Sequence, residues 1–156
     1  MQDSSSADKD HELWVLVCQA CHAALRARQK ELNQYGISAM QGVVLFIIQA
    51  IGSKATPAEI SRWLFREPHS VSGMLNRMEK QGLVRKVKDL DKKNLVRIAM
   101  TEKGQDAYYE TTKRGLIHKM MSSLSKEQRQ QLRWSLETLR DEALKELGVE
   151  RKPSFP

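Results

Sequence analysis

The order of apolar and polar residues predicts a chain made mainly of helices. From Leu13 onward, apolar residues recur at three- and four-residue spacing, and this pattern becomes more polar before it ends near Gly36. Residues Met1 to Asp10 carry serines and alternating acids without such periodicity. Residues 1–10 are therefore expected to form a mobile, disordered tail ahead of the first helix.

Two helices with clear start signals follow. Ser38 and Gln41 have the spacing of a capping box and precede a dense apolar run that ends at Gly52, so this second helix should be buried on most sides. The segment Thr56-Pro57-Ala58-Glu59 places a capping threonine before a proline suited to a first helical turn. It predicts a short third helix, roughly to Phe65.

The segment from Pro68 to Gln81 predicts a fourth helix. Val71, Leu75 and Met78 are spaced by four and three residues, which gives the helix one buried stripe. Gly82 directly follows and is expected to end it.

Alternating apolar and polar residues predict two short antiparallel strands, Leu83–Lys88 and Leu95–Met100, joined by a charged loop. Thr101 then begins a long fifth helix, and a capping box at Ser125 and Gln128 begins a last helix that closes at Gly148. Four helices, two strands and two helices make a mainly α fold with a small β-hairpin wing: a winged helix-turn-helix with a helical dimerisation region.

Charge is concentrated in the part of the chain that contains the hairpin. The 156 residues carry a net charge of +7; residues 54–104 hold 12 Lys and Arg against 6 Asp and Glu, or +6, which leaves 14 against 13, or +1, elsewhere. Such a field favours phosphate binding, because each neutralised phosphate releases counterions. Nucleic acid is the partner class that it indicates.

Other classes of protein have little support. There is no apolar stretch long enough to cross a membrane, and the polar, acidic start does not resemble an export signal, so we expect a cytoplasmic protein without a membrane partner. Phosphate loops, metalloprotease helices and nucleophile elbows are absent from the sequence, so we do not expect an enzyme.

One face of the predicted fourth helix suits DNA reading. Small hydroxyls let a helix approach the groove floor, Asn can bond adenine through two hydrogen bonds, and Arg can pair with guanine or a phosphate. The alternative is a merely solvated polar face. The face comprises His69, Ser70, Ser72, Gly73, Asn76, Arg77 and Lys80, of which Ser70, Ser72, Asn76 and Arg77 are the best candidates for base contact.

The hairpin strengthens the DNA-binding interpretation, although a charged hairpin can also simply aid solubility. Its shape suits phosphates or an adjacent minor groove. The only acids of its turn are Asp89 and Asp91, and around the turn cluster the basic and polar residues Arg85, Lys86, Lys88, Lys92, Lys93 and Asn94.

Three segments, Pro68–Val84, Asp91–Lys93 and Met100–Gly104, resemble the MarR family of winged-helix regulators, and the resemblance extends from Leu13 to Leu147. It implies a bacterial, sequence-specific regulator of transcription: a triangular homodimer, interlocked through its first, fifth and last helices, that represses by binding a palindromic operator in double-stranded DNA and is often released by a small molecule or an oxidant. The expected DNA-binding residues are Thr56, His69, Ser70, Ser72, Gly73, Asn76, Arg77, Lys80, Arg85, Lys88, Asp91, Lys92, Lys93 and Asn94.

The same resemblance sets the expected division of the chain. After the tail, residues 11–52 form dimerisation and scaffold helices, residues 53–104 the winged DNA-binding region, residues 105–148 the C-terminal dimerisation helices, and residues 149–156 a C-terminal tail. A stripe along the last helix supports dimerisation, with packing against the fifth helix as the alternative. The stripe comprises Leu132, Leu136, Leu139, Ala143 and Leu147.

The wing departs from the family in one residue. The family commonly has Asp-x-Arg there, its Arg entering the minor groove and pairing with the Asp, whereas this chain has Asp91-Lys92-Lys93. Lys keeps the charge but lacks the planar fork of Arg. We therefore expect weaker or less exacting contact from Lys93.

Cys18, Cys21 and His22 match the pattern of covalent haem attachment, but they lie within a helix and no export signal precedes them. Both thiols are expected to be buried as small apolar groups, and no cofactor is expected. The alternative is a haem, metal or redox sensor that uses these three residues, with DNA release as its output.

A third possible function is a winged helix that is used for protein contacts. The effector, the operator, the regulated genes and the choice between repression and activation stay open.

Overall fold

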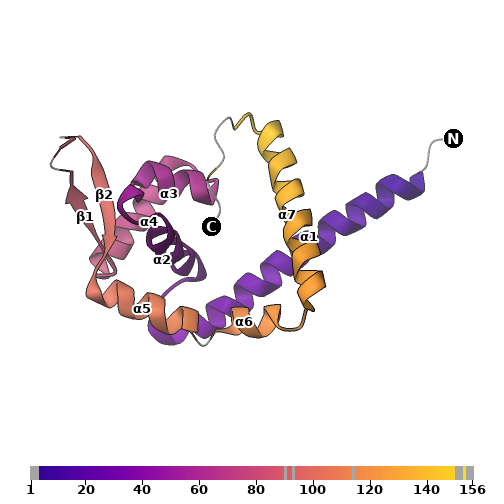
Figure 1. Cartoon of the computed structure of the whole chain (residues 1–156), viewed down its shortest axis with the longest axis horizontal. Helices are drawn as coiled ribbons and strands as arrows, with labels where there is room; N and C mark the ends of the chain where they lie inside the picture. Colours follow the sequence, from indigo (N-terminus) through magenta and orange to yellow (C-terminus); the bar gives the residue numbers. More distant parts are fainter. Residues whose placement is uncertain (1–3, 90, 93, 114, 150–152, 154–156) are drawn as a thin grey trace. The chain divides into compact units, whose positions relative to one another are not determined.

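The computed structural model describes residues 4–89, 91–92, 94–113, 115–149 and 153. It confirms the predicted fold class, because the described residues form helices and one two-stranded antiparallel hairpin (Figure 1). In chain order the described elements are α1 (Ser4–Leu32), a 3-10 helix (Asn33–Tyr35), α2 (Ala39–Ile51), a second 3-10 helix (Gly52–Lys54), α3 (Pro57–Leu64), α4 (Pro68–Lys80), β1 (Val84–Lys88), β2 (Val96–Met100), α5 (Glu102–Lys113), α6 (Leu116–Met121) and α7 (Lys126–Glu146).

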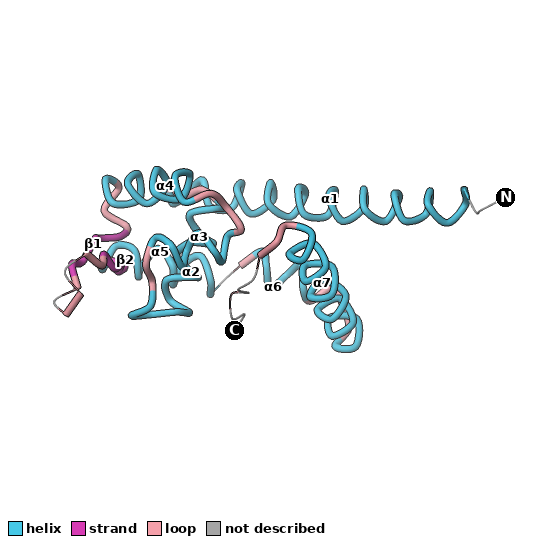
Figure 2. The backbone as a smooth tube through the Cα atoms, turned by 90° about the horizontal axis from the view of Figure 1, so that it is seen from above, coloured by secondary structure: helices cyan, strands magenta, loops and turns pink. Residues whose placement is uncertain are grey.

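The chain divides into two compact units, Met1–Ala39 and Met40–Pro156. The first contains α1, an uninterrupted helix along its whole length (Figure 2). The expectation of a tail was wrong for residues 4–10, which are helical, and for residues 1–3 it lies outside the described part. Starting a helix is costly, but each residue added to an existing helix gains one hydrogen bond for the ordering of one residue's backbone. A polar stretch can therefore continue a helix without an apolar stripe.

Gln29 organises the turn that ends this first unit. Its side-chain Nε2 donates to Asn33 Oδ1 at 2.7 Å and to the Ile37 carbonyl at 3.2 Å, and its Oε1 accepts from the Ala39 amide at 2.7 Å. Ala39 is the first residue of α2, whose amide has no partner inside the helix. One side chain of α1 thus fixes the point at which α2 begins.

The helix α2 starts directly after Ser38, as predicted, and supplies much of the core of the second unit. Its Val44, Leu45, Ile47 and Ile48 are at most 4% exposed.

Among the described residues, no single helix is long and apolar enough to cross a membrane. Residues 6–35 and 39–54 reach the necessary length and apolar composition only as a pair of helices, and this pair is bent at the break between them.

The start of α5 is fixed against the end of α4. Thr101 Oγ1 accepts from the Gly104 amide at 3.0 Å and donates to the Gly82 carbonyl at 2.5 Å. A Cβ on Gly104 would lie 1.9 Å from the Leu83 carbonyl oxygen, so only glycine permits this approach. The predicted start of the fifth helix is thereby confirmed.

The length of that fifth helix was predicted wrongly, because the structure divides it into α5 and α6. Gly115, the N-cap of α6, has extended backbone angles (φ −84°, ψ 147°), and glycine is a poor residue for a helix interior. The last helix has the predicted capping box: Gln128 N donates to Ser125 Oγ at 3.1 Å and Ser125 N to Gln128 Oε1 at 2.8 Å.

Candidate nucleic-acid interface

A short turn joins α3 to α4 and sets the angle between them. Phe65 closes α3 in the left-handed region at φ 50°, which is rare for a residue with a side chain. Ser61 Oγ donates to the Arg66 carbonyl at 2.5 Å, and the Arg66 amide donates back to the Ser61 carbonyl at 3.2 Å. Pro68 then occupies the first turn of α4, as predicted.

The far end of α4 is held by two other elements. Gln41 Nε2 of α2 donates to Gln81 Oε1, and Lys103 Nζ of α5 donates to the Gln81 carbonyl, each at 2.7 Å. The helix is therefore fixed at both ends, which is the support that a rigid reading element requires.

The two faces of α4 differ as the sequence predicts. Val71, Leu75 and Met78 are fully or almost fully buried, together with Met74, which the predicted stripe left out. None of the seven predicted residues of the opposite face is acidic, and Glu79, whose side chain is 40% exposed, lies at the edge of that face. Gly73 there is half-buried, and His69, Ser70, Ser72, Asn76, Arg77 and Lys80 are exposed.

Gly73 leaves room for the side chain of Arg77. A Cβ built on Gly73 would have Arg77 Nη1 as its nearest neighbour, at 3.8 Å. The guanidinium therefore lies back along the outer face of α4, one helical turn from its own backbone, where it can swing toward a phosphate or a base edge.

Asn76 is joined to the hairpin by Lys86, a residue that the predicted reading set did not include. Lys86 Nζ donates to Asn76 Oδ1 at 2.6 Å and lies 3.4 Å from Glu79 Oε2. Glu79 Oε1 in turn accepts from the Lys86 backbone amide at 3.3 Å. The basic cluster in the sequence contained Lys86, but only the packing of β1 beside α4 shows that it meets the reading face.

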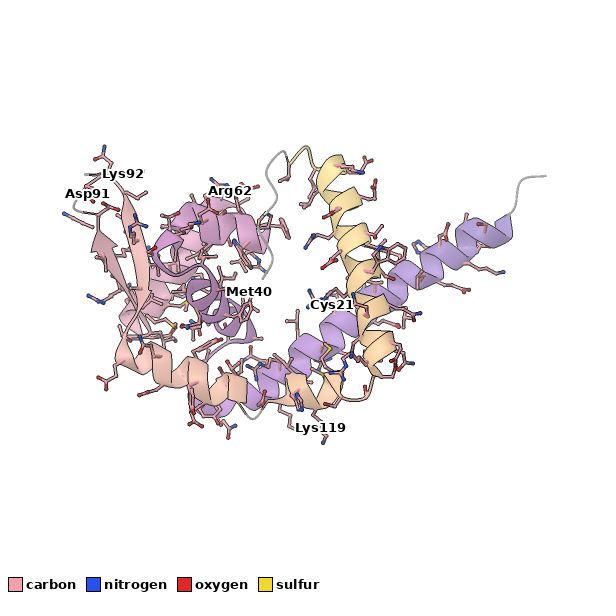
Figure 3. The ribbon with its side chains drawn as sticks, viewed as in Figure 1. Cys21, Met40, Arg62, Asp91, Lys92 and Lys119 are labelled. Carbon is pink, nitrogen blue, oxygen red and sulfur yellow. The ribbon has the colours of Figure 1, made fainter. Side chains whose placement is uncertain are left out.

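The strands of the wing, β1 and β2, form a regular antiparallel ladder. Lys88 pairs with Val96 at the end of the ladder, and the Asp89 amide donates to the Leu95 carbonyl at 2.9 Å beyond it. Figure 3 shows Asp91 and Lys92 at the tip. Of the predicted wing contacts, Lys93 lies outside the described residues; Arg85, Lys88, Asp91, Lys92 and Asn94 are exposed.

An acid–arginine pair is present in the wing, at positions other than those of the family's Asp-x-Arg pattern. Arg97 of β2 pairs with Asp89 and also donates to the Ser53 carbonyl. The other oxygen of Asp89 accepts from the amides of Asp91 and Lys92. These backbone hydrogen bonds and the Arg97 guanidinium hold the pKa of Asp89 below its ordinary value of 3.8.

Thr56 has a structural role at the base of the wing. Its Oγ1 accepts from the Glu59 amide at 3.2 Å as the predicted cap of α3, and its side chain is half-buried. The preceding Ala55 carbonyl accepts from the Ile98 amide at 2.7 Å, which ties the start of α3 to β2.

The cysteine and histidine cluster is more open than the sequence suggested. Cys18 is half-buried, whereas Cys21 and His22 are exposed, so the expectation that both thiols are buried was wrong for Cys21. The apolar arc of α1 that contains them is largely uncovered in a single chain; Trp14, for example, is 62% exposed. Among the described residues, no three His, Cys, Asp or Glu side chains are grouped so as to hold a metal ion.

The sequence profile of the MarR family matches residues 35–93. The chain is 34% identical to the organohalide-sensing RdhR-CbdbA1625 transcriptional regulator in its 2,4-dichlorophenol-bound form, with a TM-score of 0.81 and coverage of 100% of this chain and 95% of that one. No curated protein sequence matches significantly.

Two structures with DNA share the fold at lower identity. MepR of S. aureus in complex with DNA is 22% identical, with a TM-score of 0.73 and coverage of 83% of this chain and 96% of that one. A cysteine-to-serine mutant of MarR from E. coli in complex with operator DNA is 20% identical, with a TM-score of 0.74 and coverage of 85% and 96%.

Proposed function

Because the chain belongs to the MarR family of DNA-binding transcription regulators, we propose that it is a cytoplasmic, homodimeric repressor that binds a palindromic operator and is released by a small molecule. The observation that best supports the proposal is the outer face of α4: it is largely exposed, its only neighbouring carboxylate, Glu79, is paired with Lys86, and the helix is held at both ends. A helix of this kind beside a basic wing fits the major groove.

Binding to the promoter of its own gene tests this proposal. Arg77→Ala removes the one guanidinium on the outer face of α4, so the protein should lose its preference for the promoter over unrelated duplex DNA. Lys119→Ala, which changes an exposed cation on α6, serves as the matched control and should keep that preference. Unchanged selectivity in the Arg77 variant would contradict the assigned reading face.

The dimer is proposed from apolar side chains that a single chain leaves uncovered. Trp134 is 69%, Leu139 53% and Leu136 46% exposed on α7, and on α1 Trp14 is 62% and Leu16 56% exposed. Monomeric proteins rarely expose large contiguous apolar patches. These exposures favour a partner chain over the alternative in which the last helix is covered within its own chain.

A groove along α7 suggests which part of the partner lies there. It has a volume of about 960 Å³ and, besides Gln130 and Glu137, is lined by the apolar side chains of Met121, Leu132 and Leu136 and by the cations Lys126, Arg129, Arg133 and Arg140. The exposed segment of α1 has the complementary composition, with Asp8, Asp10 and Glu12 beside Leu13, Trp14 and Leu16. We propose that this segment of a second copy occupies the groove.

The effector is proposed from the relative that is 34% identical over the whole chain, which is described as organohalide-sensing and binds 2,4-dichlorophenol. A small halogenated phenol is therefore the class to test. Adding 2,4-dichlorophenol to the complex with promoter DNA should release the protein, and unsubstituted phenol, which lacks the halogens, serves as the control. Retention of DNA at millimolar 2,4-dichlorophenol would exclude this ligand and leave the DNA-binding proposal intact.

A further inference from the structure

The contact of Lys86 with Asn76 bears on which base the reading helix selects. Lys86 Nζ lies 2.6 Å from Asn76 Oδ1, and both side chains are exposed at the edge of the outer face of α4. The contact joins β1 to the helix, so neither side chain is positioned by its own element alone.

The amide of Asn76 has two different ends. Adenine is read when the oxygen of an Asn accepts from the adenine N6 amino group while its nitrogen donates to N7. In this protein an ammonium group already donates to that oxygen. Its positive charge lies where the electropositive amino group of adenine would have to approach, which disfavours adenine.

Asn76 and Lys86 together present hydrogen-bond donors to the DNA. The Asn76 nitrogen carries two N–H groups, and the Lys86 ammonium has a third N–H group besides those on the sides of Asn76 and Glu79. The major-groove edge of guanine offers two neighbouring acceptors, N7 and O6. The pair is therefore complementary to guanine at the position where Asn76 alone would suit adenine.

Glu79 keeps the ammonium in place. It is the only acid in α4, and it holds Lys86 both through the ammonium and through the backbone amide. Its negative charge is balanced by Lys86, so it does not add an unpaired carboxylate beside the phosphates.

We propose that Lys86 is a specificity-determining residue that commits Asn76 to guanine rather than adenine at one position of each operator half-site. This inference rests on the proposed function. Lys86 acts both as a donor to the base and as the group that positions the Asn76 amide.

Selection of binding sites from random duplex DNA tests the inference, because it reads base preference separately from affinity. The wild-type protein should enrich guanine at one position of each half-site, and Asn76→Ala should lose about tenfold discrimination at that position only. Lys86→Met removes the ammonium and should shift the same position to adenine. Glu79→Gln, which only loosens the hold on Lys86, should give a smaller shift in the same direction.

Lys92→Met provides the matched control, since it removes an exposed ammonium from the wing tip without touching α4. It should weaken binding and leave the base preference at the position sensitive to Asn76 unchanged. The inference is overturned if Lys86→Met behaves in the same way, because Lys86 is then a phosphate contact, or if the wild-type protein selects adenine at the position sensitive to Asn76. A wild-type selection that enriches no motif at all would instead overturn the proposed function, and the inference with it.

Discussion

Arg97 donates both Nε and Nη2 to a single carboxylate oxygen of Asp89, at 2.8 and 2.6 Å, at the turn end of the wing. The second oxygen of Asp89 accepts from the amides of Asp91 and Lys92 at 2.8 and 3.1 Å. One side chain, itself only 9% exposed, thus joins the strand that supports the wing to the turn at its tip. The positions of the Asp91 and Lys92 amides therefore depend on the charge of one carboxylate.

The first prediction concerns pH. The folded pKa of Asp89 lies below the ordinary 3.8, so its stabilisation of the wing is fully present above that value and is lost as the pH falls through the lower, folded pKa. The amide proton shifts of Asp91 and Lys92, followed by NMR, should titrate with a midpoint below 3.8. A midpoint at or above 3.8 would contradict the described contacts. In Asp89→Asn this titration should be absent, and both amides should exchange faster with solvent at neutral pH.

The second prediction concerns the packing of α5. Gly104→Ala would place a Cβ 1.9 Å from the backbone oxygen of Leu83, which cannot move without disturbing the turn after α4. Overpacking of this kind costs about 1–3 kcal/mol, and urea unfolding should show a loss in that range. A variant as stable as the wild-type protein would mean that α5 lies further from Leu83 than described.

The third prediction uses Gly73, in α4, to separate stability from DNA binding. A Cβ there has only an ordinary contact with Arg77 Nη1 at 3.8 Å, so Gly73→Ala should stabilise the protein by about 0.5–1 kcal/mol through better helix propensity. The new methyl group lies on the face proposed to approach the bases. Affinity for the promoter, measured by fluorescence anisotropy, should fall although stability rises; unchanged affinity would place this part of α4 away from the groove floor.

Features that depend on neighbouring residues were predictable from the sequence. The Thr56 cap and the capping box at Ser125 and Gln128 depend on contacts within a few positions of one helix. The spacing of the apolar residues from Val71 to Met78 is likewise local and marks the side of α4 that is buried. The exposed face of α4 followed directly, because the buried stripe fixes the rotation of the helix.

Features that depend on how elements pack were not predictable. Asn76 and Lys86 belong to different elements, and their meeting is decided by the position of β1 beside α4. The family's Asp-x-Arg pattern corresponds to Asp91 and Lys93 in this chain, whereas the ion pair in the wing joins Asp89 to Arg97 across the hairpin. The exposure of Cys21 likewise depends on what covers α1, which apolar periodicity does not specify.

The last prediction tests the proposed dimer. Leu136 lines the groove on α7, so Leu136→Asp would put a carboxylate where an apolar side chain of the partner is expected. Losing that burial should weaken the dimer at least about tenfold in sedimentation equilibrium. Glu146→Gln, an exposed substitution at the end of the same helix, is the control and should leave the dimer intact.

A charge exchange then asks whether the α1 segment is the occupant of the groove. Arg129→Glu reverses a cation that lines it, and should weaken the dimer by placing like charges next to each other. Glu12→Arg in the same chain restores the opposite charges if residues 8–16 of the partner lie there, so the double variant should recover much of the lost affinity. Additive weakening by the two substitutions would assign the groove to another segment, and a monomeric wild-type protein would remove the dimer from the proposed mechanism.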